Sequence, residues 1–109
     1  MVGERIIKEN ISNAYSHIGK KWCVEILCDL FEGKTRFTEF LENNTELSTK
    51  MLAQRLAEMQ KFHLIIKQYN NETSGHDYVL TENGKKTGKI LFAMSEFRPK
   101  TLKRNFEKS

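Results

Sequence analysis

The order of helix-like and strand-like segments is the most informative feature of this chain. From Glu4 to Ile18, apolar residues recur at three- and four-residue spacing, which predicts a helix with a stripe to bury. A second helix is predicted from Lys20 to Phe31, and its wide apolar face is typical of a central, well-covered helix. Gly33 fits the end of that second helix.

Two shorter segments come next. One helix is predicted from Phe37 to Asn43, after an extended link at Thr35 and Arg36. Ser48 is a good N-cap for the following helix, which runs to about Phe62, because its hydroxyl can accept an orphan backbone N–H. The buried side of that helix is predicted to be Leu52, Leu56 and Met59. Its other side is Thr49, Lys50, Ala53, Gln54 and Ala57. That side is small and polar, as a helix that enters a major groove to reach base edges requires.

A hairpin and a long helix complete the pattern. Strands are predicted from Leu64 to Tyr69 and from Asp77 to Leu80, around a polar loop. Thr81 can cap the final helix, in which Gly84 and Gly88 are placed to allow a close helix approach. The apolar stripe of this helix is Thr87, Ile90, Leu91, Met94 and Phe97. After Pro99, Leu102 and Phe106 predict one or two further amphipathic turns.

These elements predict a mainly α fold with a small antiparallel β-hairpin, an α+β winged helix-turn-helix. The 109 residues, 39% of them hydrophobic, are enough for one modest core and fit a single domain, 1–109. Within it, 18–81 would form the helix-turn-helix and wing, and 1–17 and 82–109 the dimerisation helices. No apolar run approaches the roughly 20 residues that span a bilayer, and the charged N-terminus lacks an apolar signal region. We therefore expect a cytoplasmic protein and no membrane partner.

Positive charge gathers at the C-terminal end of the chain. Residues 85–109 carry eight basic and two acidic side chains, whereas 1–84 carry ten basic and twelve acidic ones. Two interpretations stay open: the basic segment contacts phosphates, or it is a solvated helix face.

The sequence offers little catalytic or metal chemistry. His17, His63 and His76 are scattered, and no paired Cys/His spacing of a zinc site occurs. There is no phosphate-binding glycine loop and no nucleophile motif, so we expect no enzyme, no metal and no cofactor. Cys23 and Cys28 are five apart and fall on different helix faces, too far for a disulfide within one helix. They are interpreted as core or boundary residues, with a sensor role near Lys20 and Lys21 as the alternative.

Four segments, in order, resemble one family. The segment IGKKW at 18–22 resembles the I-G-G-K-W start of the second helix in HxlR-type transcriptional regulators, relatives of the MarR group. RFTEF at 36–40 looks like their R-F-x-E-L, and LSTKMLAQRL at 47–56 is similar to their recognition helix, I-S-x-K-x-L-x-Q-R-L. YVLTENG at 78–84 resembles their Y-x-L-T-x-x-G step from wing to final helix. The resemblance covers about residues 18–95.

The resemblance implies a homodimeric winged-helix protein that binds operator DNA and can respond to a reactive small molecule or oxidant. In this family the first and last helices build the dimer interface. This chain departs from the pattern at three places. The N-terminal cysteine of redox-sensing members aligns with Glu9, and the wing tip NNETSG at 70–75 replaces prolines and an arginine. The region 36–67 holds five basic and four acidic residues, a lean balance for a DNA module.

Candidate site residues follow from the pattern and the resemblance. The predicted DNA contacts are Arg36, Ser48, Thr49, Lys50, Gln54, Arg55, Lys67 and His76. The predicted dimer contacts are Ile7, Ile11, Tyr15, Leu91, Met94, Phe97, Leu102 and Phe106. For Arg36 the alternative to a phosphate contact is an ion pair with Glu39 or Glu42. Two interpretations of Arg55 stay open, a phosphate contact and an intramolecular salt bridge. For His76 they are a contact of the wing with DNA and an ordinary exposed histidine.

The function predicted from the sequence is a sequence-specific DNA-binding transcriptional regulator, a repressor, acting as a homodimer on a near-palindromic operator. Its partners would be double-stranded DNA, a second copy and an unidentified small-molecule or redox effector. The alternative is a winged-helix module that binds another protein without specific DNA binding, which the lean charge of the recognition region favours.

Overall fold

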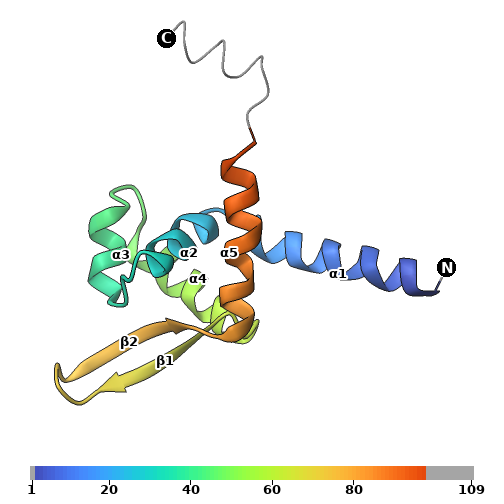
Figure 1. Cartoon of the computed structure of the whole chain (residues 1–109). Helices are drawn as coiled ribbons and strands as arrows, with labels where there is room; N and C mark the ends of the chain where they lie inside the picture. The colour runs from blue at the N-terminus through green and yellow to red at the C-terminus, as the bar shows by residue number, and fades with distance from the viewer. Residues whose placement is uncertain (1, 98–109) are drawn as a thin grey trace, which may run out of the picture.

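The computed structural model describes residues 2–97 and contains five helices and one hairpin in that range (Figure 1). The elements are α1 (Val2–Ile18), α2 (Cys23–Phe31), α3 (Phe37–Asn43), α4 (Thr49–Lys61), β1 (Ile65–Asn70), β2 (Gly75–Leu80) and α5 (Glu82–Ser95). The predicted fold, mainly α with a small antiparallel hairpin, is confirmed. Pro99, Leu102 and Phe106 lie outside the described residues.

The predicted bounds of the second helix and of both strands were wrong. The second helix begins at Cys23 and not at Lys20, because Trp22 adopts a left-handed backbone with φ 75° that interrupts the helical path. The strands extend further toward the turn than predicted: Asn70 pairs with Gly75 at the end of the ladder, and residues 71–74 form the turn.

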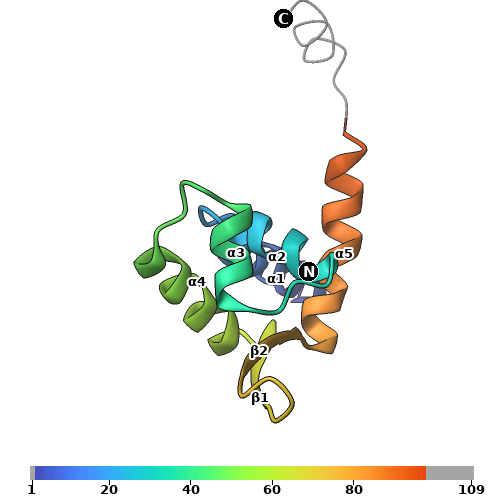
Figure 2. The ribbon, with the colours of Figure 1, turned by 90° about the vertical axis from the view of Figure 1, so that its left-hand side faces the viewer.

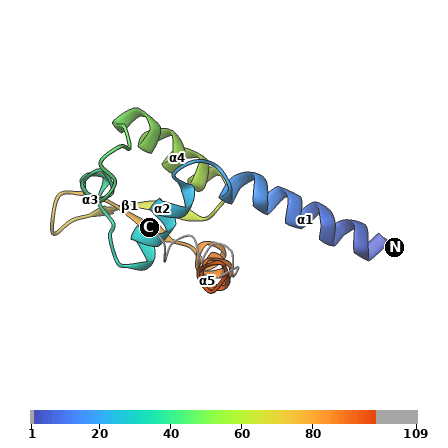
Figure 3. The ribbon, with the colours of Figure 1, turned by 90° about the horizontal axis from the view of Figure 1, so that it is seen from above.

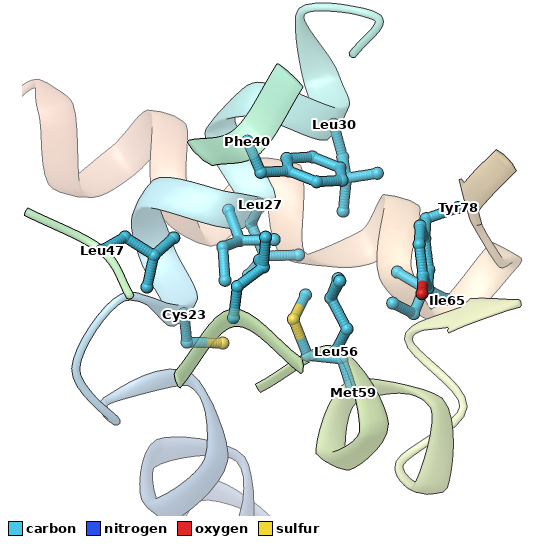
Figure 4. Close-up of a cluster of buried hydrophobic side chains, with 11 residues drawn as sticks. Cys23, Leu27, Leu30, Phe40, Leu47, Leu56, Met59, Ile65 and Tyr78 are labelled. Carbon is cyan, nitrogen blue, oxygen red and sulfur yellow. The ribbon is translucent and has the colours of Figure 1, made fainter. Parts of the chain in front are cut away.

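The core lies where α2, α3, α4 and the hairpin meet (Figure 4). Its largest fully buried side chains are Phe40, Ile26, Leu27, Leu52, Leu56 and Ile65. The predicted stripe of α4 is confirmed, since Leu52, Leu56 and Met59 are all buried. This packing holds α4 on one side and leaves its opposite side to the solvent. Figure 2 shows the hairpin below α3 and α4, on the same part of the molecule.

The turn between α3 and α4 is fixed by a buried carboxylate. Asp29 of α2 is only 3% exposed and accepts hydrogen bonds from the side-chain amides of Asn43 and Asn44. The Asn44 amide also donates to the carbonyl of Phe40. A buried charge requires such partners, and these same bonds set the direction in which α4 leaves the turn.

The two terminal helices lie differently against this body. α1 projects away from it in Figures 1 and 3, and residues 3–16 are all exposed. α5 begins in close contact: a Cβ at Gly84 would lie 2.0 Å from the Leu64 carbonyl oxygen, and one at Gly88 would lie 3.0 Å from the Phe31 ring. The predicted close approach to another helix is therefore confirmed at Gly88, whereas Gly84 lies against the base of the hairpin.

Candidate nucleic-acid interface

The outer side of α4 is the first part of the candidate interface. Ser48 caps the helix, because its Oγ accepts the Met51 amide N–H at 3.0 Å. On the far side from the core, the exposed residues are Thr49, Lys50, Ala53, Gln54 and Ala57, as the sequence predicted. Gln54 Nε2 donates to Glu58 Oε1 of the same helix at 3.3 Å. This surface combines small side chains with three polar ones, Thr49, Lys50 and Gln54, that can reach a base edge.

A cleft lies beside this surface, between α4 and the hairpin. Its volume is about 610 Å³. It is lined by Arg36, Phe37 and Thr38 of the α3 start, Ala53, Leu56, Ala57 and Gln60 of α4, and Lys67, His76 and Tyr78 of the hairpin. The structure therefore brings Arg36, Lys67 and His76 together next to the exposed side of α4. Gln60 and Thr38, which sequence reasoning missed, also line the cleft.

Lys67 and His76 occupy neighbouring register positions on one face of the hairpin. Lys67 pairs with Tyr78 across the ladder, and its Nζ lies 5.8 Å from the Tyr78 ring centroid. His76 pairs with Tyr69, and their rings meet edge to face with centroids 5.4 Å apart. Both polar side chains are exposed. Each of these two polar groups therefore lies near an aromatic ring on this face of the hairpin.

Arg36 does make an ion pair, but not with the residues the sequence suggested. Its Nε lies 2.9 Å from Oδ1 of Asp77 on β2. Glu39 instead accepts the backbone N–H groups of Thr35 and Arg36, which lowers the pKa of the Glu39 carboxyl from its usual value. The alternative partners Glu39 and Glu42 were therefore wrong, since Glu39 is occupied with the helix start.

Arg55 bonds within its own chain. Its Nε donates to the Lys21 carbonyl at 2.7 Å, and its Nη1 lies 3.1 Å from Glu58 Oε2. Glu58 also pairs with Lys20 at 3.3 Å. The salt-bridge interpretation of Arg55 is confirmed, and these contacts tie α4 to the junction between α1 and α2.

Asp77 is a site residue that sequence reasoning missed. Its carboxylate accepts from Asn70 Nδ2 at 2.9 Å and from Thr35 Oγ1 at 3.0 Å, in addition to the Arg36 ion pair. The hydrogen bond from Asn70, followed by those from Thr35 and Arg36, holds the pKa of Asp77 below its usual value. No local pattern could have revealed this, because Thr35 and Asp77 are far apart in the sequence.

The cysteines and histidines form no second site in residues 2–97. Cys23 is buried and Cys28 is exposed, which confirms that they lie on different faces of α2. No group of three or more His, Cys, Asp or Glu side chains within that range could hold a metal ion. Helices of membrane-crossing length and apolarity are likewise absent from this range.

The terminal helices expose apolar side chains. On α1, Ile7, Ile11 and Tyr15 are 59%, 63% and 77% exposed, and Ile6 joins them. On α5, Met94 is exposed together with Ile90 and Phe92, whereas Leu91 packs against the core and Thr87 is buried. The placement of Phe97 in this helix was wrong: α5 ends at Ser95, and Phe97 is exposed just beyond it. The predicted α5 stripe is therefore divided: one edge packs inward and the other faces the solvent. The sequence pattern missed Ile6 and Phe92.

Comparison with known proteins decides the family. The model of the HxlR-like helix-turn-helix family matches residues 17–106. This chain belongs to the HxlR-like helix-turn-helix family. An uncharacterized HTH-type transcriptional regulator of Methanothermobacter thermautotrophicus is 34% identical over 89 residues, which are 81% of this chain and 68% of the relative. The HTH-type transcriptional regulator YodB of Bacillus subtilis is 37% identical over 75 residues, 68% of this chain and 67% of YodB.

Solved structures agree with this assignment. The reduced form of YodB matches with a TM-score of 0.73 and 33% identity over 79% of this chain and 85% of that one. A MarR-family transcriptional regulator of Enterococcus faecalis matches with a TM-score of 0.77 and 25% identity, covering 94% and 93% of the two chains. This HxlR-like chain is accordingly a transcriptional regulator with a DNA-binding winged helix-turn-helix, and not an enzyme.

Proposed function

We propose that this regulator is a homodimeric repressor that inserts α4 into the major groove of a near-palindromic operator. One observation carries the proposal: the small, polar, exposed side of α4 adjoins a cleft that gathers Arg36, Lys67 and His76. Thr49, Lys50 and Gln54 would read base edges, and the Ser48 hydroxyl would donate to a phosphate. The DNA strand that borders the groove would run along the cleft, between α4 and the wing.

The second copy is proposed from the exposed apolar side chains of the terminal helices. Helix α1 has residues 3–16 exposed and still carries an apolar stripe, which is unfavourable in water. A second copy of the chain would cover Ile7, Ile11 and Tyr15 of α1, Met94 of α5, and Phe97 just after that helix. Two copies related by a two-fold axis would address half-sites about one helical turn apart, roughly 34 Å.

Domain roles and location follow from the same proposal. Residues 18–81 would bind DNA, and the helices on either side would join the two copies. A repressor that binds chromosomal operators would act in the cytoplasm. Regulation by a small molecule is also proposed, because YodB has been solved in a quinone-bound form.

The test is fluorescence anisotropy with the promoter fragment upstream of the gene, against an unrelated duplex, at two salt concentrations. We expect tight binding that the unrelated duplex does not displace. Lys50→Ala should weaken that binding about tenfold, because it removes a base or phosphate contact. Lys8→Ala removes the same charge from α1, which projects away from α4, and should change the affinity less than twofold (Figure 1).

The contrary result is equally clear. Weak binding that disappears for both duplexes as salt rises, with Lys50→Ala no worse than Lys8→Ala, would leave only generic charge attraction. It would favour the alternative function, a winged helix that binds a partner protein.

A further inference from the structure

The wing is fastened to the helix-turn-helix through one carboxylate. Asp77 lies on β2. Its Oδ1 accepts from Thr35 and pairs with Arg36, both in the segment before α3, and its Oδ2 accepts from Asn70 of β1. A main-chain bond reinforces the junction, since the Tyr78 N–H donates to the Thr35 carbonyl at 2.9 Å. The side chains of Arg36 and Asp77 are 28% and 20% exposed, so the pair is partly shielded from water.

The arrangement also fixes the Arg36 guanidinium. The ion pair holds the guanidinium on its Nε side, since Nε lies 2.9 Å from Oδ1 of Asp77. The guanidinium lies directly on Gly75, where a Cβ would come within 1.9 Å of Nη1. Arg36 at the same time lines the cleft beside α4. A guanidinium held at Nε in this way is pre-oriented, so less side-chain freedom is lost when its outer nitrogens bind a phosphate.

We propose that Asp77 is a positioning residue for DNA binding, which fixes the wing against α3 and aims the outer nitrogens of Arg36 at a backbone phosphate in the cleft. This inference rests on the proposed operator binding. Asp77 would then favour the binding of DNA although both carry negative charge.

The sign of the effect makes the inference testable. A carboxylate near DNA repels phosphates, so on charge alone the removal of Asp77 should strengthen binding. Positioning predicts the opposite, because a released Arg36 no longer meets its phosphate. Glu72 in the wing turn offers a matched control, because it is exposed and carries the same charge. Its main-chain N–H donates to Oδ1 of Asn70, a bond that Glu72→Gln keeps, and its carboxylate has no described contact with Asp77 or Arg36.

The experiment compares the wild type, Asp77→Asn and Glu72→Gln against the promoter fragment over a range of salt concentrations. We expect Asp77→Asn to bind about tenfold more weakly, and Glu72→Gln to bind as tightly as the wild type or more tightly. The slope of log affinity against log salt should become shallower by about 0.9 per subunit in Asp77→Asn, because one phosphate contact is lost. A merely less stable protein would lose active concentration without a change in that slope.

Two further variants test the route through Arg36. Arg36→Gln should produce the same loss of slope, and adding Asp77→Asn to it should cost little more, since coupled residues are not additive. Asp77→Glu keeps the charge and should recover part of the affinity. If circular dichroism shows that Asp77→Asn is unfolded, Thr35→Val tests the positioning role instead. This variant removes one hydrogen-bond donor to the Asp77 carboxylate and keeps its charge. It should weaken DNA binding about threefold.

The outcomes separate the two proposals. If the wild type binds its promoter specifically and Asp77→Asn binds as tightly as Glu72→Gln, the positioning role is overturned and operator binding stands. If the wild type does not distinguish the promoter from the unrelated duplex, operator binding fails and the positioning role with it.

Discussion

The two cysteine side chains lie in different surroundings on α2, but neither environment favours the thiolate. Burial raises the pKa of Cys23 to about 11. Partial desolvation of the otherwise exposed thiol, and then the neighbouring carboxylates Asp29, Glu32 and Glu25, raise the pKa of Cys28 above its usual value. Lys20, which kept a sensor role open, is paired with Glu58. Thiol-based sensing therefore lacks the low pKa on which it depends.

We predict slow reaction of both thiols at neutral pH. With Ellman's reagent at pH 7, Cys28 should react more slowly than free cysteine, because it is accessible but protonated. Cys23 should react only after denaturant is added, since it is 2% exposed. Cys28→Ser should remove the first phase and leave the second. A thiol that reacts faster than free cysteine in the native protein would contradict this and restore the sensor role.

His17 predicts a pH dependence of stability. Its Nδ1 is buried without a hydrogen-bond partner among the described residues, and its ring lies against Phe62. Desolvation, and then the charge of Lys20, lower the pKa of His17 from 6.5. The folded state therefore favours neutral imidazole, and its stability contribution is present above pH 6.5 and lost as the pH falls below that value.

Thermal unfolding between pH 8 and pH 5 checks this prediction. The melting temperature of the wild type should fall as the pH drops through the range below 6.5, and His17→Gln should show a smaller fall. Equal slopes for the two proteins would mean that another group carries the dependence.

At the residue scale, the sequence revealed local roles and missed distant ones. Ser48 and Thr81 were predicted as caps because an N-cap needs only its own hydroxyl and an N–H three residues on, and both bonds are present. Asp77 was missed because its partners Thr35 and Arg36 lie some forty positions away. The ion pair of Arg36 with Asp77 was beyond local reasoning for the same reason.

Among the elements, α3 was predicted at its observed bounds and α4 within one residue, since each has a clear apolar side and a turn before it. The start of α2 was not predicted correctly. Nothing in the pattern of 20–23 shows that Trp22 takes a left-handed backbone, because its ring packs against the core as helix residues do. Tertiary packing, and not helix propensity, decides that boundary.

The contact between α5 and the base of the hairpin predicts a sharp difference between two glycines. Gly84→Ala places a methyl 2.0 Å from the Leu64 carbonyl oxygen, which is backbone and cannot turn aside. We expect it to lower the free energy of unfolding by about 2–3 kcal/mol. Gly3→Ala in α1 meets nothing within 4 Å and should leave stability unchanged or raise it by up to about 1 kcal/mol.

Urea denaturation of the two variants and the wild type gives these free energies. A Gly84→Ala protein as stable as Gly3→Ala would show that α5 can move away from the hairpin without cost.

For the whole molecule, the exposed stripe of α1 predicts self-association. Ile11→Glu puts a charge in the centre of the stripe and should convert the protein from dimer to monomer at micromolar concentration. Ser12→Glu adds the same charge beside the stripe and should remain dimeric. Sedimentation velocity distinguishes the two. A wild-type monomer at this concentration would contradict the proposed assembly.

The sequence predicted the overall architecture because each element carried its own signal, from the β-branched and aromatic residues in 64–69 to the long stripe of α5. It could not predict how the α5 stripe would be divided. Leu91 packs against the core and Thr87 is buried, while Ile90 and Met94 are exposed, and the spacing of the apolar residues does not show which edge of the helix packs inward.

Trp22, the residue with the left-handed backbone between α1 and α2, is also an intrinsic fluorescent probe. Trp22 is the single tryptophan of the chain, and it lies between α1 and α2 with Lys21 Nζ 5.7 Å from its ring centroid. Tryptophan emission therefore comes from one position, the joint where α1 leaves the body (Figure 1). Any tilt of α1 that accompanies DNA or effector binding would change the surroundings of this one fluorophore, and could be followed in real time without attaching a dye.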